Sequence, residues 1–109
     1  MTARPVWLID DDDEWCARVC RLLAPHGIPV VSMGTLAAGL SRVDEIGRPA
    51  AVVMDAASRC EHSAGVEALR HDATLRHVPI GFVKKTAALD AVLLMLTSSA
   101  AGAASHRAA

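Results

Sequence analysis

Short apolar runs alternate with amphipathic segments along the chain. The apolar runs at 5–9, 28–32, 50–54 and 78–83 have the length of strands that are buried on both faces of a parallel sheet. Apolar residues at helical spacing lie between and after them, at 15–24, at 35–43, in a short segment after Gly65, and at 86–98. This alternation predicts a parallel α/β sheet built from right-handed β-α-β units.

The length and composition fit one domain. The chain has 109 residues, of which 52% are hydrophobic, so it can bury one core but not two. We expect a domain over residues 1–99. Residues 100–109 are small or polar and are expected to form a flexible tail.

The balance of charge excludes one broad class of function. With 11 basic and 12 acidic residues the formal net charge is -1, whereas a general nucleic-acid binder carries a basic excess. No apolar run reaches the ~18 residues that a membrane span requires, and the first residues lack the apolar core of a secretory signal. The three cysteines have the spacing of neither a disulfide scaffold nor a zinc site. These features predict a reduced, cytoplasmic protein that binds neither nucleic acid nor membrane.

Carboxylates directly follow the first and third predicted strands. Asp10 and Asp11 end the first apolar run, and Asp55 ends the third. In a flavodoxin-like, doubly wound sheet these strands are neighbours, so the carboxylates meet at the carboxyl edge. Such a cluster needs a counter-charge, which Mg²⁺ can supply. A carboxylate beside the ion can form an aspartyl-phosphate, whose oxygens a nearby lysine can stabilise. The alternative is structural, because aspartates also cap helices and form turns.

Five short sequences, distributed over the chain, match motifs of one known family. They are VWLIDDD (6–12), VVMD (52–55), GVEALR (65–70), HVPI (77–80) and KTAALD (85–90). Together they resemble the receiver domain of bacterial two-component response regulators, over nearly the whole chain. The 45 residues that separate Asp10 from Asp55 also fit the spacing in that family. The resemblance implies a flavodoxin-like sheet, here with strand order 2-1-3-4.

The resemblance implies roles for the matching residues. Asp10 and Asp11 would bind Mg²⁺ together with Asp55, and the backbone carbonyl of Ala57 would complete the metal shell. Asp55 would accept a phosphoryl group from a histidine kinase or a phosphotransfer protein. Lys85 would contact that phosphoryl group.

The chain departs from the family pattern near its last strand. The family has a fourth strand ending in Ser or Thr, then a helix, then a fifth strand ending in Lys-Pro. Here residues 78–85 look like the start of the family's fourth strand joined directly to the end of its fifth strand, so that one strand and one helix are missing. A strand-four alignment places Lys84 at the Ser/Thr position and facing the site, whereas the KTAALD match favours Lys85 as the phosphoryl contact. We favour Lys85 and expect the output of such a domain to be altered.

These observations predict a single-domain response regulator of a phosphorelay. It would not be an enzyme, beyond catalysing its own phosphorylation and dephosphorylation. The alternative is a pseudo-receiver, which uses the fold as a protein-interaction module without phosphorylation. A metal-dependent phosphatase with Asp55 as nucleophile fits less well, because Ala57 occupies the place of its general acid.

The last predicted helix is apolar on all sides. Leu94 and Met95 lie outside the stripe that would face the core, and a surface helix ordinarily has a polar back. The fourth strand would also be the outer edge of a shortened sheet, where unpaired backbone groups invite pairing. We therefore expect a homodimer, or another protein partner, at the last helix and this edge strand.

Overall fold

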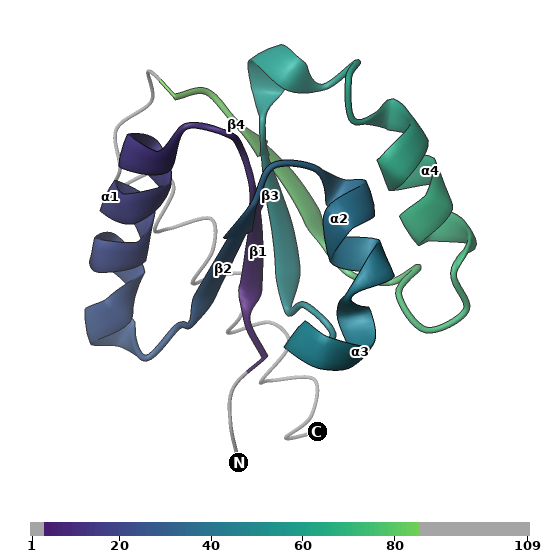
Figure 1. Ribbon diagram of the computed structural model, residues 1–109, viewed down its shortest axis with the longest axis horizontal. Coiled ribbons are helices and arrows are strands. Elements are labelled where there is room, and N and C mark those ends of the chain that lie inside the picture. Colours follow the sequence, from purple (N-terminus) through teal and green to yellow (C-terminus); the bar gives the residue numbers. More distant parts are fainter. Residues whose placement is uncertain (1–3, 86–109) are drawn as a thin grey trace.

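A four-stranded parallel sheet forms the centre of the molecule (Figure 1). The computed structural model describes residues 4–85. The strands lie in the order β2-β1-β3-β4, and all neighbouring pairs are parallel. They are β1 (Val6–Ile9), β2 (Val30–Met33), β3 (Ala51–Asp55) and β4 (Ile80–Val83). The predicted α/β, flavodoxin-like sheet with strand order 2-1-3-4 is confirmed.

Helices cover both faces of this sheet (Figure 1). One face carries α1 (Asp13–Leu23), which continues into the 3-10 turn η1 (Ala24–His26). The other face carries α2 (Leu36–Ser41), α3 (Val43–Ile46) and α4 (Ser63–His71). A second 3-10 turn, η2 (Ala56–Ser58), directly follows β3.

Alternate residues of each strand enter two hydrophobic clusters, one on each face. Along β1, Val6 and Leu8 belong to the cluster under α1, while Trp7 and Ile9 belong to the opposite cluster. The α1-face cluster is completed by Trp15, Cys16, Val19, Leu23, Val53 and Val83. The α4-face cluster is completed by Leu36, Val52, Met54, Leu69 and Leu75.

The strand register brings three chain segments to one edge of the sheet. Ile9, the last residue of β1, pairs with Met54 of β3, so Asp10 and Asp55 follow at the same level. Asp55 pairs in turn with Val83, the last residue of β4. The residues that follow β1, β3 and β4 therefore meet at the carboxyl edge.

The second strand and the helix that follows it differ from their predicted bounds. The strand expected at 28–32 lies at Val30–Met33, because the N–H of Ile28 donates back to the carbonyl of Leu23 at 3.4 Å and the next residue, a proline, has no N–H to donate. The helix expected at 35–43 is interrupted at Arg42, whose ψ of 16° departs from helical geometry.

The fourth strand is shorter than predicted. It begins at Ile80 rather than at 78, because the N–H of Val78 donates to the carbonyl of Leu75 at 3.0 Å. The side chain of Arg70 in α4 also donates to the carbonyl of Val78 at 2.9 Å. These bonds fix the turn that leads into β4.

The predicted last helix at 86–98, with Leu94 and Met95, lies outside the described residues, as does the predicted tail at 100–109. Within residues 4–85, no helix combines the length and the apolar character needed to cross a bilayer.

Candidate functional site

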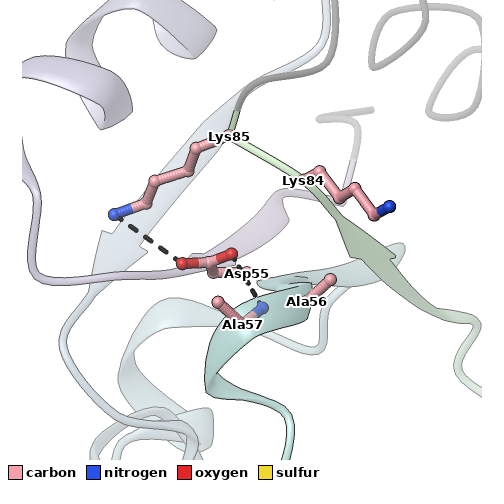
Figure 2. A pocket seen from close by; sticks show the side chains of 5 residues that line it. All are labelled: Asp55, Ala56, Ala57, Lys84 and Lys85. Atoms are coloured by element: carbon pink, nitrogen blue, oxygen red, sulfur yellow. Dashed lines mark hydrogen bonds and ion pairs between the residues drawn. The ribbon is translucent and has the colours of Figure 1, made fainter.

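Asp55 lies at the end of β3 and borders a cavity. Its Oδ1 accepts a hydrogen bond from the N–H of Ala57 at 3.0 Å, within turn η2. The cavity has a volume of about 510 Å³ and is lined by Asp55, Ala56, Ala57, Lys84 and Lys85 (Figure 2). The hydrogen bond holds one carboxylate oxygen, while Oδ2 is the oxygen nearest Lys85, at 3.9 Å.

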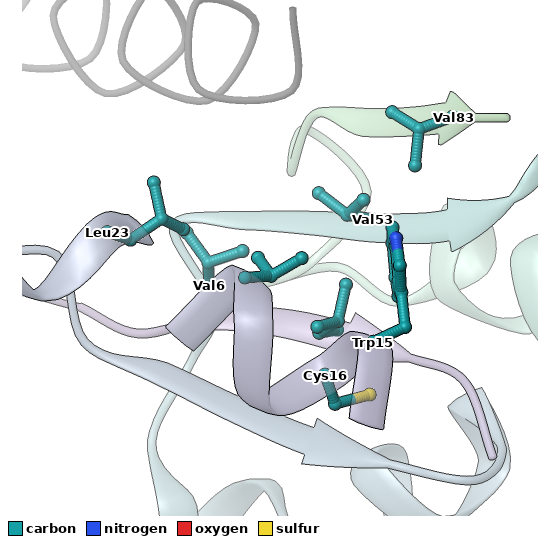
Figure 3. Packing of buried hydrophobic residues seen from close by; sticks show 8 residues of the cluster. Val6, Trp15, Cys16, Leu23, Val53 and Val83 are labelled. Carbon is teal, nitrogen blue, oxygen red and sulfur yellow. The ribbon is translucent and has the colours of Figure 1, made fainter. Parts of the chain in front are cut away.

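The start of α1 lies at the same edge. Asp12 is the N-cap of α1, and its Oδ1 accepts the N–H of Trp15 at 3.1 Å, which satisfies an otherwise unpaired helix donor. This hydrogen bond lowers the pKa of Asp12 below its ordinary value of 3.8. Trp15 is buried and belongs to the α1-face cluster with Val53 and Val83 (Figure 3).

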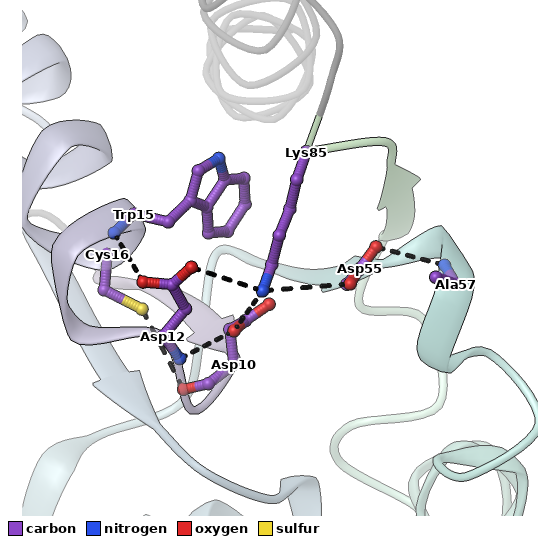
Figure 4. Close-up of polar contacts among 7 residues, drawn as sticks. All are labelled: Asp10, Asp12, Trp15, Cys16, Asp55, Ala57 and Lys85. Atoms are coloured by element: carbon purple, nitrogen blue, oxygen red, sulfur yellow. Dashed lines mark hydrogen bonds and ion pairs between the residues drawn. The ribbon is translucent and has the colours of Figure 1, made fainter.

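Lys85 joins the carboxylates that meet at this edge (Figure 4). Its Nζ lies 2.9 Å from Asp10 Oδ1, 3.6 Å from Asp12 Oδ2 and 3.9 Å from Asp55 Oδ2. It also lies 5.9 Å from the ring centroid of Trp15. The hydrogen bond to Asp10 raises the pKa of Lys85 above its ordinary value of 10.5. The ammonium thus supplies a counter-charge within the carboxylate cluster.

Asp10 is the most enclosed of these carboxylates. Its side chain is 3% exposed, against 14% for Asp55 and 45% for Asp12. Besides Lys85, its Oδ1 contacts the N–H of Asp12, which donates to it at 2.8 Å. An enclosed carboxylate is costly without such partners, so Lys85 and the backbone of Asp12 together stabilise Asp10.

Asp11 lies apart from the lysine. It is exposed, and the carboxylates within 4 Å of Lys85 Nζ in the described part of the chain are Asp10, Asp12 and Asp55. Asp11 instead lines a separate cavity of about 70 Å³, whose other walls are Ile9, Asp10, Gly34, Ser58, Glu61 and His62.

Asp12 is the site residue that the sequence analysis did not select. Its signal is its position as N-cap, because capping of α1 holds the carboxylate at the same edge as Asp10.

Two carboxylates of the site have the chemistry that the expected magnesium ion requires. Among residues 4–85, no three His, Cys, Asp or Glu side chains are grouped so that they could hold a metal ion. Magnesium needs only one or two protein carboxylates when water and a phosphate oxygen complete its shell. Asp10 and Asp55, which both lie within 4 Å of the Lys85 ammonium, offer two such groups. Their chemistry fits the ion, which would share the cluster with Lys85.

Cys16 packs in the α1-face cluster, next to the backbone of Asp10. It is 4% exposed, and its Sγ contacts the carbonyl of Asp10 at 3.9 Å. Burial raises the pKa of the Cys16 thiol to about 11, which keeps it protonated at neutral pH and unreactive. Cys16 therefore packs as a small core residue.

Comparisons with known proteins were made for the whole chain. No protein-family model and no curated protein matches it. The NMR structure of the pseudo-receiver domain of the CikA protein is similar with a TM-score of 0.57 and 18% identity, over 90% of this chain and 98% of that one. The crystal structure of response regulator RPA3017, in red light signaling of R. palustris, is similar with a TM-score of 0.63 and 15% identity, over 88% and 90%. The chain has a receiver-like fold.

A further solved structure has the same kind of likeness. It contains a yeast Spc42 trimeric coiled-coil segment fused to another structure, and it matches with a TM-score of 0.67 and 15% identity, over 91% of this chain and 78% of that one. Identities at this level speak to architecture alone. The receiver-like fold therefore frames the site, and the chemistry has to be argued from the side chains.

Proposed function

We propose that this receiver-like chain is a response regulator of a phosphorelay, with Asp55 as its phosphoacceptor. The observation that carries the proposal is the placement of Asp55. One of its oxygens is held by the N–H of Ala57, the other is nearest Lys85, and the carboxylate borders a cavity. A carboxylate in such a position can act as a nucleophile.

The proposed step is an in-line phosphoryl transfer. An Asp55 oxygen forms a bond to phosphorus while the bond from phosphorus to the donor's histidine nitrogen breaks, and the released imidazole takes its proton from water. The N–H of Ala57 orients the carboxylate, and Lys85 stabilises the phosphoryl oxygens. Magnesium, held by Asp10 and Asp55 with Asp11 and the carbonyl of Ala57 as further predicted ligands, would neutralise charge on the phosphoryl group.

The proposed partners are proteins. A histidine kinase or phosphotransfer protein would supply the phosphoryl group at the carboxyl edge. A second copy of the chain, or another protein, would read the signal at the β4 edge, where Ile80 and Phe82 are partly exposed.

Labelling with acetyl phosphate tests the proposal. With Mg²⁺ present, intact-mass measurement should show addition of one phosphoryl group to the parent and none to Asp55→Asn. Asp72→Asn is the matched control, because Asp72 also accepts a backbone N–H two residues on but lies away from the site. Labelling that survives in Asp55→Asn would move the acceptor elsewhere.

A pseudo-receiver is the second candidate, and one feature favours it. On β4, the residue level with Asp55 is Val83, and two lysines follow it. The described end of this strand therefore has no hydroxyl that could form a hydrogen bond to a phosphoryl group on Asp55. This second candidate would be established if the parent took no label and if the parent and Asp55→Asn bound a protein partner equally well.

A further inference from the structure

We propose that Lys84 is an anion-binding residue of the cavity beside Asp55, where it holds the phosphoryl group from the side opposite Lys85. This inference rests on the proposed function and extends it. It gives the phosphoryl group a second lysine, in addition to Lys85 and the proposed Mg²⁺, and assigns a role to the residue that follows β4.

The strand geometry places the two lysines on either side of the site. Val83 pairs with Asp55, and Lys84 and Lys85 follow directly. Figure 2 shows their side chains leaving the end of β4 in opposite directions. Lys85 extends to the carboxylates beside Trp15, whereas Lys84 lines the far side of the same cavity of about 510 Å³.

The charges near Lys85 explain why a second lysine would help even when Mg²⁺ is bound. Three carboxylates lie within 4 Å of its single ammonium, and the nearest is Asp10 rather than Asp55. A phosphoryl group adds about two further negative charges. Lys85 and the proposed Mg²⁺ balance the three carboxylates but not this addition, so an incoming phosphoryl compound still meets a net negative site.

Lys84 has the position and the freedom to supply the missing charge. It is exposed, and within residues 4–85 it forms no ion pair. The remaining cavity walls are the methyl side chains of Ala56 and Ala57, which leave room for a small phosphoryl group. An ammonium donor to such a group forms a charge-assisted hydrogen bond, stronger than one from a neutral hydroxyl.

The experiment compares Lys84→Gln and Lys84→Arg with a neighbouring cation. Arg59 is the matched control, because its guanidinium lies 4.5 Å over the Phe82 ring but does not line the cavity. One measurement is the initial rate of labelling by acetyl phosphate at limiting concentration. The other is binding of inorganic phosphate, followed by amide NMR shifts at Asp55 and Ala57, which needs no reaction.

The expected result is specific to Lys84. Lys84→Gln should label about tenfold more slowly, the loss of one charge-assisted hydrogen bond, and should bind phosphate correspondingly more weakly. Lys84→Arg and Arg59→Gln should stay within about twofold of the parent. Because Lys84 is exposed, urea unfolding of Lys84→Gln should match the parent, which separates this loss from misfolding.

Each other outcome decides between the two proposals. Normal labelling and phosphate binding in Lys84→Gln would overturn the role of Lys84 and leave Asp55 as phosphoacceptor. An equal loss in Arg59→Gln would also overturn the role of Lys84, because the loss would then come from the general positive charge of the surface and not from a contact made by Lys84. A parent that takes no label but binds phosphate in a Lys84-dependent way would overturn the phosphoacceptor and support the anion site.

Discussion

The hydrophobic clusters on the two faces of the sheet differ in whether a buried tryptophan also lies near the charged residues at the carboxyl edge. On the α1 face, Trp15 belongs to the hydrophobic cluster and also lies 5.9 Å from Lys85. On the α4 face, Trp7 is fully buried, and its Nε1 has no hydrogen-bond partner among residues 4–85. One tryptophan thus connects core and site, and the other serves packing alone. Substitutions on the α4 face should therefore change stability without changing the reactivity of the carboxylates at the edge.

The largest expected effect is on the α4 face. Leu69 is fully buried there, so Leu69→Ala should lower the free energy of unfolding by about 2–5 kcal/mol in urea titrations, through lost burial and a residual cavity. Leu40→Ala, at a partly buried position packed on the same cluster, should cost clearly less. Folded Leu69→Ala should still react with acetyl phosphate at the parent rate. A slower rate per folded molecule would erase the distinction between the faces.

A smaller effect is expected where a helix approaches Trp7. A Cβ added at Gly39 would lie 2.9 Å from the Trp7 ring and would also contact the sulfur of Met33. Gly39→Ala should therefore destabilise the protein by about 1–3 kcal/mol, after which thermal melts would show a lower midpoint. Gly34→Ala is the control, since no atom of the described part of the chain lies within 4 Å of its added Cβ, and it should stay within about 0.5 kcal/mol of the parent. A neutral Gly39→Ala would mean that α2 can move away from Trp7 at little cost.

The smallest expected effect is the dependence of stability on pH at the charged edge. The pKa of Lys85 is raised above 10.5 by its hydrogen bond to Asp10, so the pair stabilises the fold below that pH and is lost as pH rises through the raised pKa. Lys85→Met should remove this alkaline decline. Denaturant titrations between neutral and alkaline pH would measure it, with Lys84→Met as the control that retains the decline. Curves of the same shape for Lys85→Met and the parent would show that the pair does not contribute.

Asp12 gives the opposite dependence. Its pKa is lowered, chiefly by the N–H of Trp15, so its contribution is present above pH 3.8 and is lost as pH falls through the lowered pKa. Lys85→Met should keep this acid decline, because the main cause lies in the helix cap. The two ends of the pH range thus report on different bonds of one cluster.

The sequence was sufficient to predict the strand order of the sheet and the meeting of Asp10 and Asp55 at its carboxyl edge. These features depend on local signals, namely short apolar runs and carboxylates at their ends, and parallel topology then converts chain order into proximity. The break at Arg42 and the late start of β4 could not be predicted in this way. They depend on hydrogen bonds made by Gly39, Arg70 and Leu75, which the hydrophobic pattern does not contain.

The second carboxylate illustrates the limit within the site. Adjacent aspartates look alike in sequence, and the family resemblance selected Asp11. In the structure Asp12 contacts Lys85, because the N-cap conformation directs its carboxylate, while Asp11 lies on a neighbouring cavity. Which of several consecutive side chains reaches a point depends on the backbone dihedral angles of the turn. The assignment of Asp11 to the metal remains a prediction.

The pairing of Asp55 with Val83 sets which of the two lysines that follow β4 faces Asp10. Side chains alternate along a strand, so a slip of β4 by one residue would exchange the faces of Lys84 and Lys85. A lysine would still reach Asp10, but Phe82 would leave the α4-face cluster and Val83 the α1-face cluster. The consecutive lysines thus make the charge of the site insensitive to such an error, and correct alignment is enforced by the apolar residues that precede them.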